Sequence, residues 1–171
     1  AKHCDTYALF GEPRAQVTQL ISRINAEAAR HRRQPNFNLS FRPIIGATEE
    51  EAWRKAKAIL AGVEASGGGG GHGVPQAETA RRLMRLIEGG EIQDECLWVP
   101  IAAAAKGSGN STALVGTAEQ VAEAIAKYYD LGVKGVLIRG FDPFNDAIEY
   151  GHELIPQIRE KVAARDAAKT V

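Results

Sequence analysis

The feature that most constrains the fold of this chain is the alternation of short apolar segments with segments of helical periodicity. Four segments have the length and composition of buried strands: CDTYALF (4–10), FNLSFRPII (37–45), TALVG (112–116) and GVLIRG (135–140). After each of them apolar residues recur at helical spacing, in predicted helices at about 13–33, from 48 onward, at 118–131 and at about 144–159. Strands that alternate with helices predict a parallel sheet with right-handed crossovers.

Local signals mark several of the helix ends. Thr48 with Glu51, and Thr117 with Gln120, have the spacing of a capping pair, in which a hydroxyl accepts from a backbone N–H and the longer side chain reaches back. Gly132 stands where a left-handed residue is expected to end the third helix. These signals predict helices that begin at 48–49 and 117–118.

A long insertion separates the second and third of these strand–helix units. Its glycine-rich run SGGGGGHGVPQ (66–76) follows a helix, whereas a phosphate-binding loop follows a strand, so we expect a flexible loop. A helix is predicted at about 76–88, and an irregular connection at 96–111. We therefore expect one domain over 1–171 with a flexible insertion at about 65–111.

Two α/β architectures fit the alternation: an open doubly wound sheet and part of a (β/α)8 barrel. The turns after the strands read GEP, GAT, GT and GFDP, and none is a dinucleotide-binding fingerprint. A complete barrel needs eight strand–helix units and this chain has four, so the barrel interpretation requires further units.

Composition and charge exclude several classes of protein. The net charge is zero and the longest basic run is the short segment 30–33, which argues against a nucleic-acid partner. No apolar run is long enough to span a membrane and the first residues do not form a signal peptide, which predicts a cytoplasmic protein without a membrane partner. Cys4 and Cys96 lack metal-binding spacing, so no metal site is expected, and Cys4 is read as a small buried hydrophobe.

The segments CDTYALFGEP, RPIIGATEEEAW, TALVGTAEQVAEAIAKYYDLGVKGVLIRGF and YGHELIP together resemble the C-terminal half of the bacterial luciferase-like flavin monooxygenases, and within them the alkanesulfonate monooxygenase group. The resemblance implies a TIM barrel of which this chain holds roughly the last four units, with the main flavin-phosphate contacts upstream of Ala1. Because half a barrel leaves sheet edges and apolar surface uncovered, we expect a homo-oligomer or pairing with the other half.

Active sites of such barrels lie at the carboxyl ends of the strands, and there Ser40 and Arg42 are the candidate catalytic residues. The two share one face of their strand. The planar guanidinium of Arg42 suits an anionic substrate or a flavin phosphate, and the alternative is a structural ion pair. The resemblance places the pair where the alkanesulfonate enzymes carry arginine and histidine, so the histidine is lacking here.

The candidate substrate-binding residues are Phe10, Phe141, Arg139 and Lys106. Phe10 lies at the end of the first strand, where it either approaches the flavin or packs in the core. The resemblance puts Phe141 at the position of a tyrosine, and because a phenyl ring has no hydroxyl it can only form an apolar wall. Lys106 belongs to a candidate lid that would meet an anionic group.

Arg139 has two interpretations. It either helps to bind substrate or forms a surface ion pair with Asp142 or Asp146, and the second is favoured.

The resemblance implies an FMNH2-dependent monooxygenase in which a separate NAD(P)H flavin reductase supplies reduced FMN. With O2, such an enzyme oxygenates a small organosulfur or other organic anion, such as an alkanesulfonate. The alternatives are a deazaflavin-dependent oxidoreductase of the same superfamily and a non-catalytic flavin-binding module.

Overall fold

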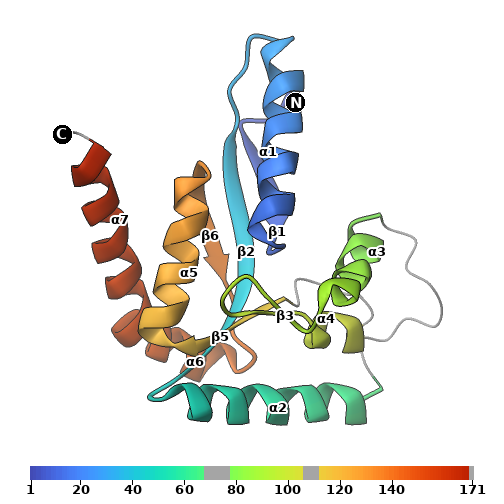
Figure 1. The fold of residues 1–171 in the computed structure, drawn as a ribbon, viewed down its shortest axis with the longest axis vertical. Coiled ribbons are helices and arrows are strands. Elements are labelled where there is room, and N and C mark those ends of the chain that lie inside the picture. Colours follow the sequence, from blue (N-terminus) through green and yellow to red (C-terminus); the bar gives the residue numbers. More distant parts are fainter. Residues whose placement is uncertain (68–77, 106–111, 170–171) are drawn as a thin grey trace.

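The computed structural model describes residues 1–67, 78–105 and 112–169 (Figure 1). The first part of the chain forms β1 (Thr6–Phe10), α1 (Arg14–Ala29), β2 (Asn36–Gly46) and α2 (Glu49–Ala65). The insertion forms α3 (Glu78–Arg85), the 3-10 helix η1 (Leu86–Gly89), β3 (Ile92–Gln93), β4 (Leu97–Trp98) and α4 (Pro100–Ala104). The last part forms β5 (Ala113–Thr117), α5 (Ala118–Asp130), β6 (Val133–Ile138), α6 (Pro143–Glu149), the π-helix η2 (Tyr150–Leu154) and α7 (Ile155–Lys169).

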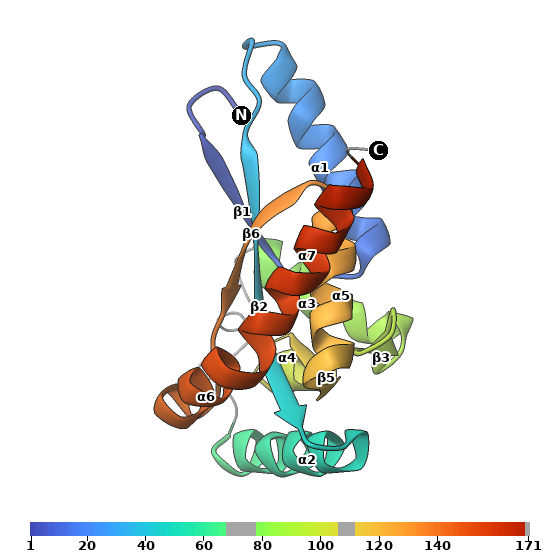
Figure 2. The ribbon, with the colours of Figure 1, turned by 90° about the vertical axis from the view of Figure 1, so that its left-hand side faces the viewer.

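The long strand β2 is the centre of the sheet. It pairs in parallel with β1 from Asn36 to Ser40 and with β6 from Phe37 to Phe41, so the three strands lie in the order β1-β2-β6. Helices α1, α5 and α7 lie together on one side of these strands (Figure 2). This is the curled, helix-backed parallel sheet of a partial barrel.

Strand β5 does not lie between β2 and β6, which corrects the expectation of four consecutive barrel units. The carbonyl of Ser40 accepts from Gly11 N–H at 3.0 Å, and Arg42 N–H donates to the Thr112 carbonyl at 3.1 Å. Residues two apart direct these groups to the same edge of a strand, so β1 and β5 share one edge of β2 while β6 occupies the other. Three strands therefore form the barrel-like sheet.

The connection between α2 and α5 has more regular structure than the sequence indicates. Residues 96–111 were expected to be irregular, but β4 pairs with β5 in antiparallel fashion, and β3 pairs with β4. Helix α4 follows directly. The sequence signal fails here because strands of two residues are too short to show a period.

The other predicted elements are confirmed, with shifted ends. Helix α3 continues into η1 as expected at 76–88, whereas the last predicted helix is interrupted by the π-helix η2 and extends to Lys169. The Thr117–Gln120 capping box is complete. At α2, Thr48 accepts from Glu51 N–H, but the Glu51 carboxylate accepts from the N–H of Ala47 instead of Thr48.

The main core lies between the sheet and the helices behind it. Alternate residues of β2 point into it, and they pack with apolar residues of α1 and α5: Phe37, Leu39, Phe41, Val17, Ile21, Val121, Ile125 and Tyr128. A second core lies under α2, which crosses the carboxyl end of β2 (Figure 1). A small third core in the insertion contains Leu83, Leu86, Val99 and Ala102.

The opposite face of the sheet is much less covered. Asn38 and Ser40 on β2 are half-buried, and Leu137, which is in register with Ser40 on β6, is 55% exposed. An exposed leucine on the face of a parallel sheet is unusual, because such sheets are normally covered on both faces. Among the residues that the structure describes, no helix is long and apolar enough to cross a membrane.

Candidate functional site

The carboxyl ends of β2 and β6 bring together the candidate residues Arg42 and Phe141. The guanidinium carbon of Arg42 lies 4.8 Å from the centre of the Phe141 ring, and its Nη1 donates to the Gly140 carbonyl at 3.1 Å. The strand holds the backbone of Arg42, and the turn after β6 holds its side chain. The geometry is that of a cation–π pair, and the hydrogen bond to Gly140 helps to orient the guanidinium.

Arg42 is half-buried and lies near a second cation, Arg139. Burial lowers the pKa of its guanidinium from the usual value, and the positive charge of Arg139 lowers this pKa further. A half-buried cation beside a second cation favours the binding of an anion, which offsets both effects. The site therefore has the charge to recognise a carboxylate, sulfonate or phosphate.

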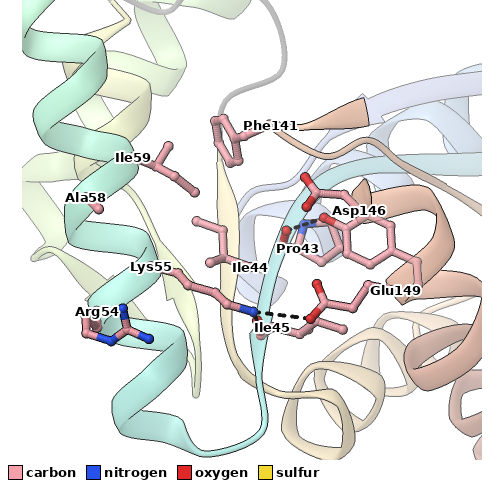
Figure 3. Close-up of a pocket in the computed structure, with 11 residues that line it drawn as sticks. Pro43, Ile44, Ile45, Arg54, Lys55, Ala58, Ile59, Phe141, Asp146 and Glu149 are labelled. Atoms are coloured by element: carbon pink, nitrogen blue, oxygen red, sulfur yellow. Dashed lines mark hydrogen bonds and ion pairs between the residues drawn. The ribbon is translucent and has the colours of Figure 1, made fainter. Parts of the chain in front are cut away.

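A pocket of about 310 Å³ lies on the other side of Phe141, between α2 and α6. Figure 3 shows the ring of Phe141 at one end, Ile44 and Ile59 along the wall, and the pair of Lys55 and Glu149 at the other end. The pocket is therefore formed by three segments that are far apart in the sequence.

Two side chains around this pocket complete the edge of β2 beyond the end of β6. The Phe41 carbonyl accepts from Arg139 N–H at 3.1 Å, the Pro43 carbonyl accepts from the buried hydroxyl of Tyr150, and the Ile45 carbonyl accepts from Lys55 Nζ at 2.9 Å. Lys55 also lies 3.2 Å from Glu149 Oε1. The carbonyls of Phe41, Pro43 and Ile45 on this edge of β2 thus all accept hydrogen bonds. The first donor is a backbone N–H that follows β6, and the other two donors are side chains.

The remaining candidates lie at different distances from this centre. Ser40 lies two residues before Arg42 on the same face of β2 and is half-buried. Phe10 packs against the small core of the insertion, which is the structural role the sequence left open. Lys106 lies outside the described residues.

Arg139 forms no ion pair with Asp142 or Asp146, so that expectation is wrong. Asp142 instead caps α6 by accepting from Asn145 N–H, and Asp146 accepts from Asp142 N–H at 2.9 Å. The two carboxylates are used to close the turn after β6, because the N–H groups at the start of a helix need acceptors.

Sequence reasoning assigned no role to Lys55, Glu149 and Tyr150, which meet only in the folded chain, although Tyr150 opens the segment YGHELIP that carries the resemblance. It also missed Glu12, which follows β1 and is 4% exposed. Glu12 pairs with Arg82 of α3, and burial raises the pKa of the Glu12 carboxyl while the Arg82 charge opposes that rise. This pair attaches the insertion to the carboxyl end of β1. The sequence analysis identified the GEP turn that contains Glu12, but no residue near this turn indicates that Arg82 is its partner.

Comparison with known proteins places this arrangement in a family. The family model of luciferase-like monooxygenases matches residues 1–135, and the chain belongs to that family. The similar solved structures include a long-chain alkane monooxygenase and an EDTA monooxygenase.

Solved structures agree on the fold and differ in activity. Riboflavin lyase (RcaE), with modified FMN and riboflavin bound, is 22% identical, with a TM-score of 0.65 over 94% of this chain and 39% of its own. Long-chain alkane monooxygenase (LadA) is 16% identical, with a TM-score of 0.63 over 94% and 37%. The coenzyme F420-dependent tetrahydromethanopterin reductase of Methanopyrus kandleri is 17% identical, with a TM-score of 0.53 over 92% and 46%. This chain thus spans less than half the length of each.

Proposed function

We propose that this chain contributes three barrel strands and the anion-binding residues to an FMNH2-dependent monooxygenase. A separate NAD(P)H flavin reductase supplies the reduced FMN, and O2 is the oxidant. The substrate is a small organosulfur anion such as an alkanesulfonate. The observation that carries the proposal is the half-buried Arg42 over Phe141, next to Arg139, in a member of the luciferase-like monooxygenase family.

The proposed roles follow from charge and position. Arg42 holds the anionic group of the substrate through charge-assisted hydrogen bonds, and Arg139 adds to the positive potential. Ser40, on the same face of β2, donates a hydrogen bond to the bound molecule. Phe141 excludes water from one side of the site, and Phe10 and Lys106 remain candidate contacts at its border.

The donor set of this chain fits one anionic group. The guanidinium of Arg42 suits a flavin phosphate as well as a sulfonate, so either anion is a candidate ligand of Arg42. When bound, reduced FMN supplies the electrons that activate O2. The uncovered face around Leu137, 55% exposed, supports the proposal that a second copy or further barrel units complete the site.

A second candidate is an oxidoreductase that uses a deazaflavin. The similarity to an F420-dependent reductase, at a TM-score of 0.53, supports this second candidate. The two candidates differ in their reaction with oxygen, because the monooxygenase consumes O2 together with substrate and the reductase does not.

The deciding experiment titrates this chain with reduced FMN and with reduced F420, and records the mass of each complex by light scattering. Oxygen uptake is then followed with methanesulfonate present, for the native chain and for R42M. The matched control is R23M, because Arg23 is exposed on α1, away from this site.

We expect FMN binding, oxygen uptake coupled to loss of the sulfonate, and at least tenfold weaker sulfonate binding in R42M only. Binding of F420 without oxygen uptake supports the reductase. If the measured mass is that of an oligomer, and this oligomer binds flavin but does not turn over the sulfonate, the result supports a non-catalytic flavin-binding module. Failure of R42M to weaken sulfonate binding removes Arg42 from the site.

A further inference from the structure

The turn after β6, residues 140–142, contacts the Arg42 side chain at two points. The Gly140 carbonyl accepts from Nη1 of Arg42 at 3.1 Å, and the ring of the next residue, Phe141, lies 4.8 Å from the guanidinium carbon. A long, flexible side chain keeps one orientation only if the groups that contact it are themselves held in place. The conformation of this turn therefore influences where the positive charge of Arg42 points.

The side chain of Asp146, in α6, contacts this turn on both sides of Phe141. Its Oδ2 accepts from the N–H of Asp142 at 2.9 Å, and the N–H of Asp146 donates to the Asp142 carbonyl at 2.9 Å. The same side chain packs directly against Gly140, where an added Cβ would overlap Cβ and Oδ2 of Asp146. One residue of α6 thus holds both neighbours of Phe141.

The contacts of Asp146 differ from those of the other carboxylate in the turn. Asp142 serves the first turn of α6, because its carboxylate accepts from the N–H of Asn145. Asp146 serves the residue before the helix, and in the described part of the chain no lysine, arginine or histidine forms an ion pair with it. A half-buried carboxylate without a cation gains its stabilisation from the hydrogen bond it accepts. The place of the oxygen atom, more than its charge, therefore matters to the turn.

We infer that Asp146 is a positioning residue: it fixes the Gly140 carbonyl and the Phe141 ring. Through these two groups it orients the guanidinium of Arg42. As a statement about function, the inference rests on the proposed function, in which Arg42 binds the anionic group. As a statement about the orientation of Arg42, it rests on the contacts within the turn alone.

Three variants separate the position of the Asp146 carboxylate from its charge. D146A removes the acceptor, and D146N keeps an oxygen in the same place without the charge. D142A is the matched control, because it removes the other carboxylate of the turn and leaves the N–H that donates to Asp146.

Two measurements are made on each variant. Proton–nitrogen NMR of the Arg42 side chain, assigned by the signals that R42M lacks, reports its orientation, because protons above the face of an aromatic ring are shifted upfield. Isothermal titration with methanesulfonate reports the anion site. We expect D146N and D142A to keep the shift and to bind as the native chain does. D146A should lose the shift and bind about three- to tenfold more weakly, which is the effect of one hydrogen bond.

An upfield shift that is absent from the native chain, or that persists in D146A, overturns the inference. So does a D146N variant that behaves as D146A, because the charge would then be what matters. Equal losses in D142A and D146A overturn it as well, since any damage to the start of α6 would have the same effect.

Circular dichroism checks the fold of each variant. If D146A does not fold, G140A tests the same contact from the other side, because the added Cβ displaces the Asp146 carboxylate, and the result expected for D146A applies to it. A native chain that binds no methanesulfonate contradicts the proposed anion site. The NMR measurement contains no ligand, so it decides the role of Asp146 in either case.

Discussion

The hydroxyl of Tyr150, at the start of the π-helix η2, donates a hydrogen bond to the carbonyl of Pro43 at the end of β2. Tyr150 is 4% exposed, and burial together with the nearby Asp146 and Glu149 raises the pKa of its hydroxyl. It is therefore a neutral donor at neutral pH. The residue before Pro43 is Arg42, so this bond also holds the backbone of the proposed anion site.

Y150F is expected to destabilise the chain by about 1–3 kcal/mol, because the buried Pro43 carbonyl loses its donor. Urea unfolding followed by circular dichroism measures the change. Y129F is the control: the Tyr129 hydroxyl bonds to Asp166 at the surface, and its loss should change stability by less than about 0.5 kcal/mol. Equal effects of the two substitutions would show that the Pro43 bond contributes no more than a surface bond.

Glu95 predicts an acid-sensitive contact between the insertion and α1. Its hydrogen bond with Arg14, aided by one with Lys127, lowers the pKa of the carboxyl to about 2 from the ordinary value of 4.5. A carboxyl whose pKa is depressed by folding stabilises the folded state above its unfolded pKa. This contribution is lost as the pH falls from about 4.5 to about 2.

E95Q should therefore lose less stability than the native chain between pH 5 and pH 2.5. At pH 7 E95Q should be less stable than the native chain, by less than about 1 kcal/mol because the ion pair is partly exposed. Urea midpoints at the two pH values measure this, with E88Q as the control at an exposed position of η1. The prediction fails if the native chain and E95Q show the same pH dependence.

Two glycines with open space around them should respond to alanine in opposite directions. Gly132 has a φ of +96°, which an alanine adopts only with strain, so G132A should cost about 1 kcal/mol or more. Gly62 lies inside α2, and apart from its chain neighbours and the backbone of its own helix no atom lies within 4 Å of an added methyl, so G62A should stabilise by about 0.5–1 kcal/mol. Thermal unfolding of both variants measures the difference, and the same sign for both would contradict the backbone argument.

The two cysteines should react at very different rates. Cys96 is buried, and burial raises the pKa of its thiol to about 12. Cys4, which the sequence analysis took as a buried hydrophobe, is instead half-exposed and precedes β1. Because the thiolate is the reactive form, a disulfide reagent at pH 8 should modify one thiol quickly and the second only after denaturation. C4S should lose the fast reaction. Two fast thiols in the native chain would show that Cys96 is accessible.

Features that depend on neighbouring residues could be predicted from the sequence. The Thr117–Gln120 capping box, the left-handed Gly132 and the strand-to-helix alternation were all predicted, because each is set by contacts within one turn or by a short period. The assignment of Arg42 to an anion site stays a prediction, which rests on the position of active sites at the carboxyl ends of barrel strands.

The order of the strands and the surroundings of Arg42 could be seen only in the folded chain. The segment 113–117 has the pattern of a barrel strand followed by a capped helix, yet it lies on the same edge of β2 as β1, and β6 takes the other edge. The pocket brings together Lys55, Phe141 and Glu149 from three distant segments. The period of a strand records which of its faces is buried but not which strand pairs with it, since every parallel partner offers the same backbone hydrogen bonds.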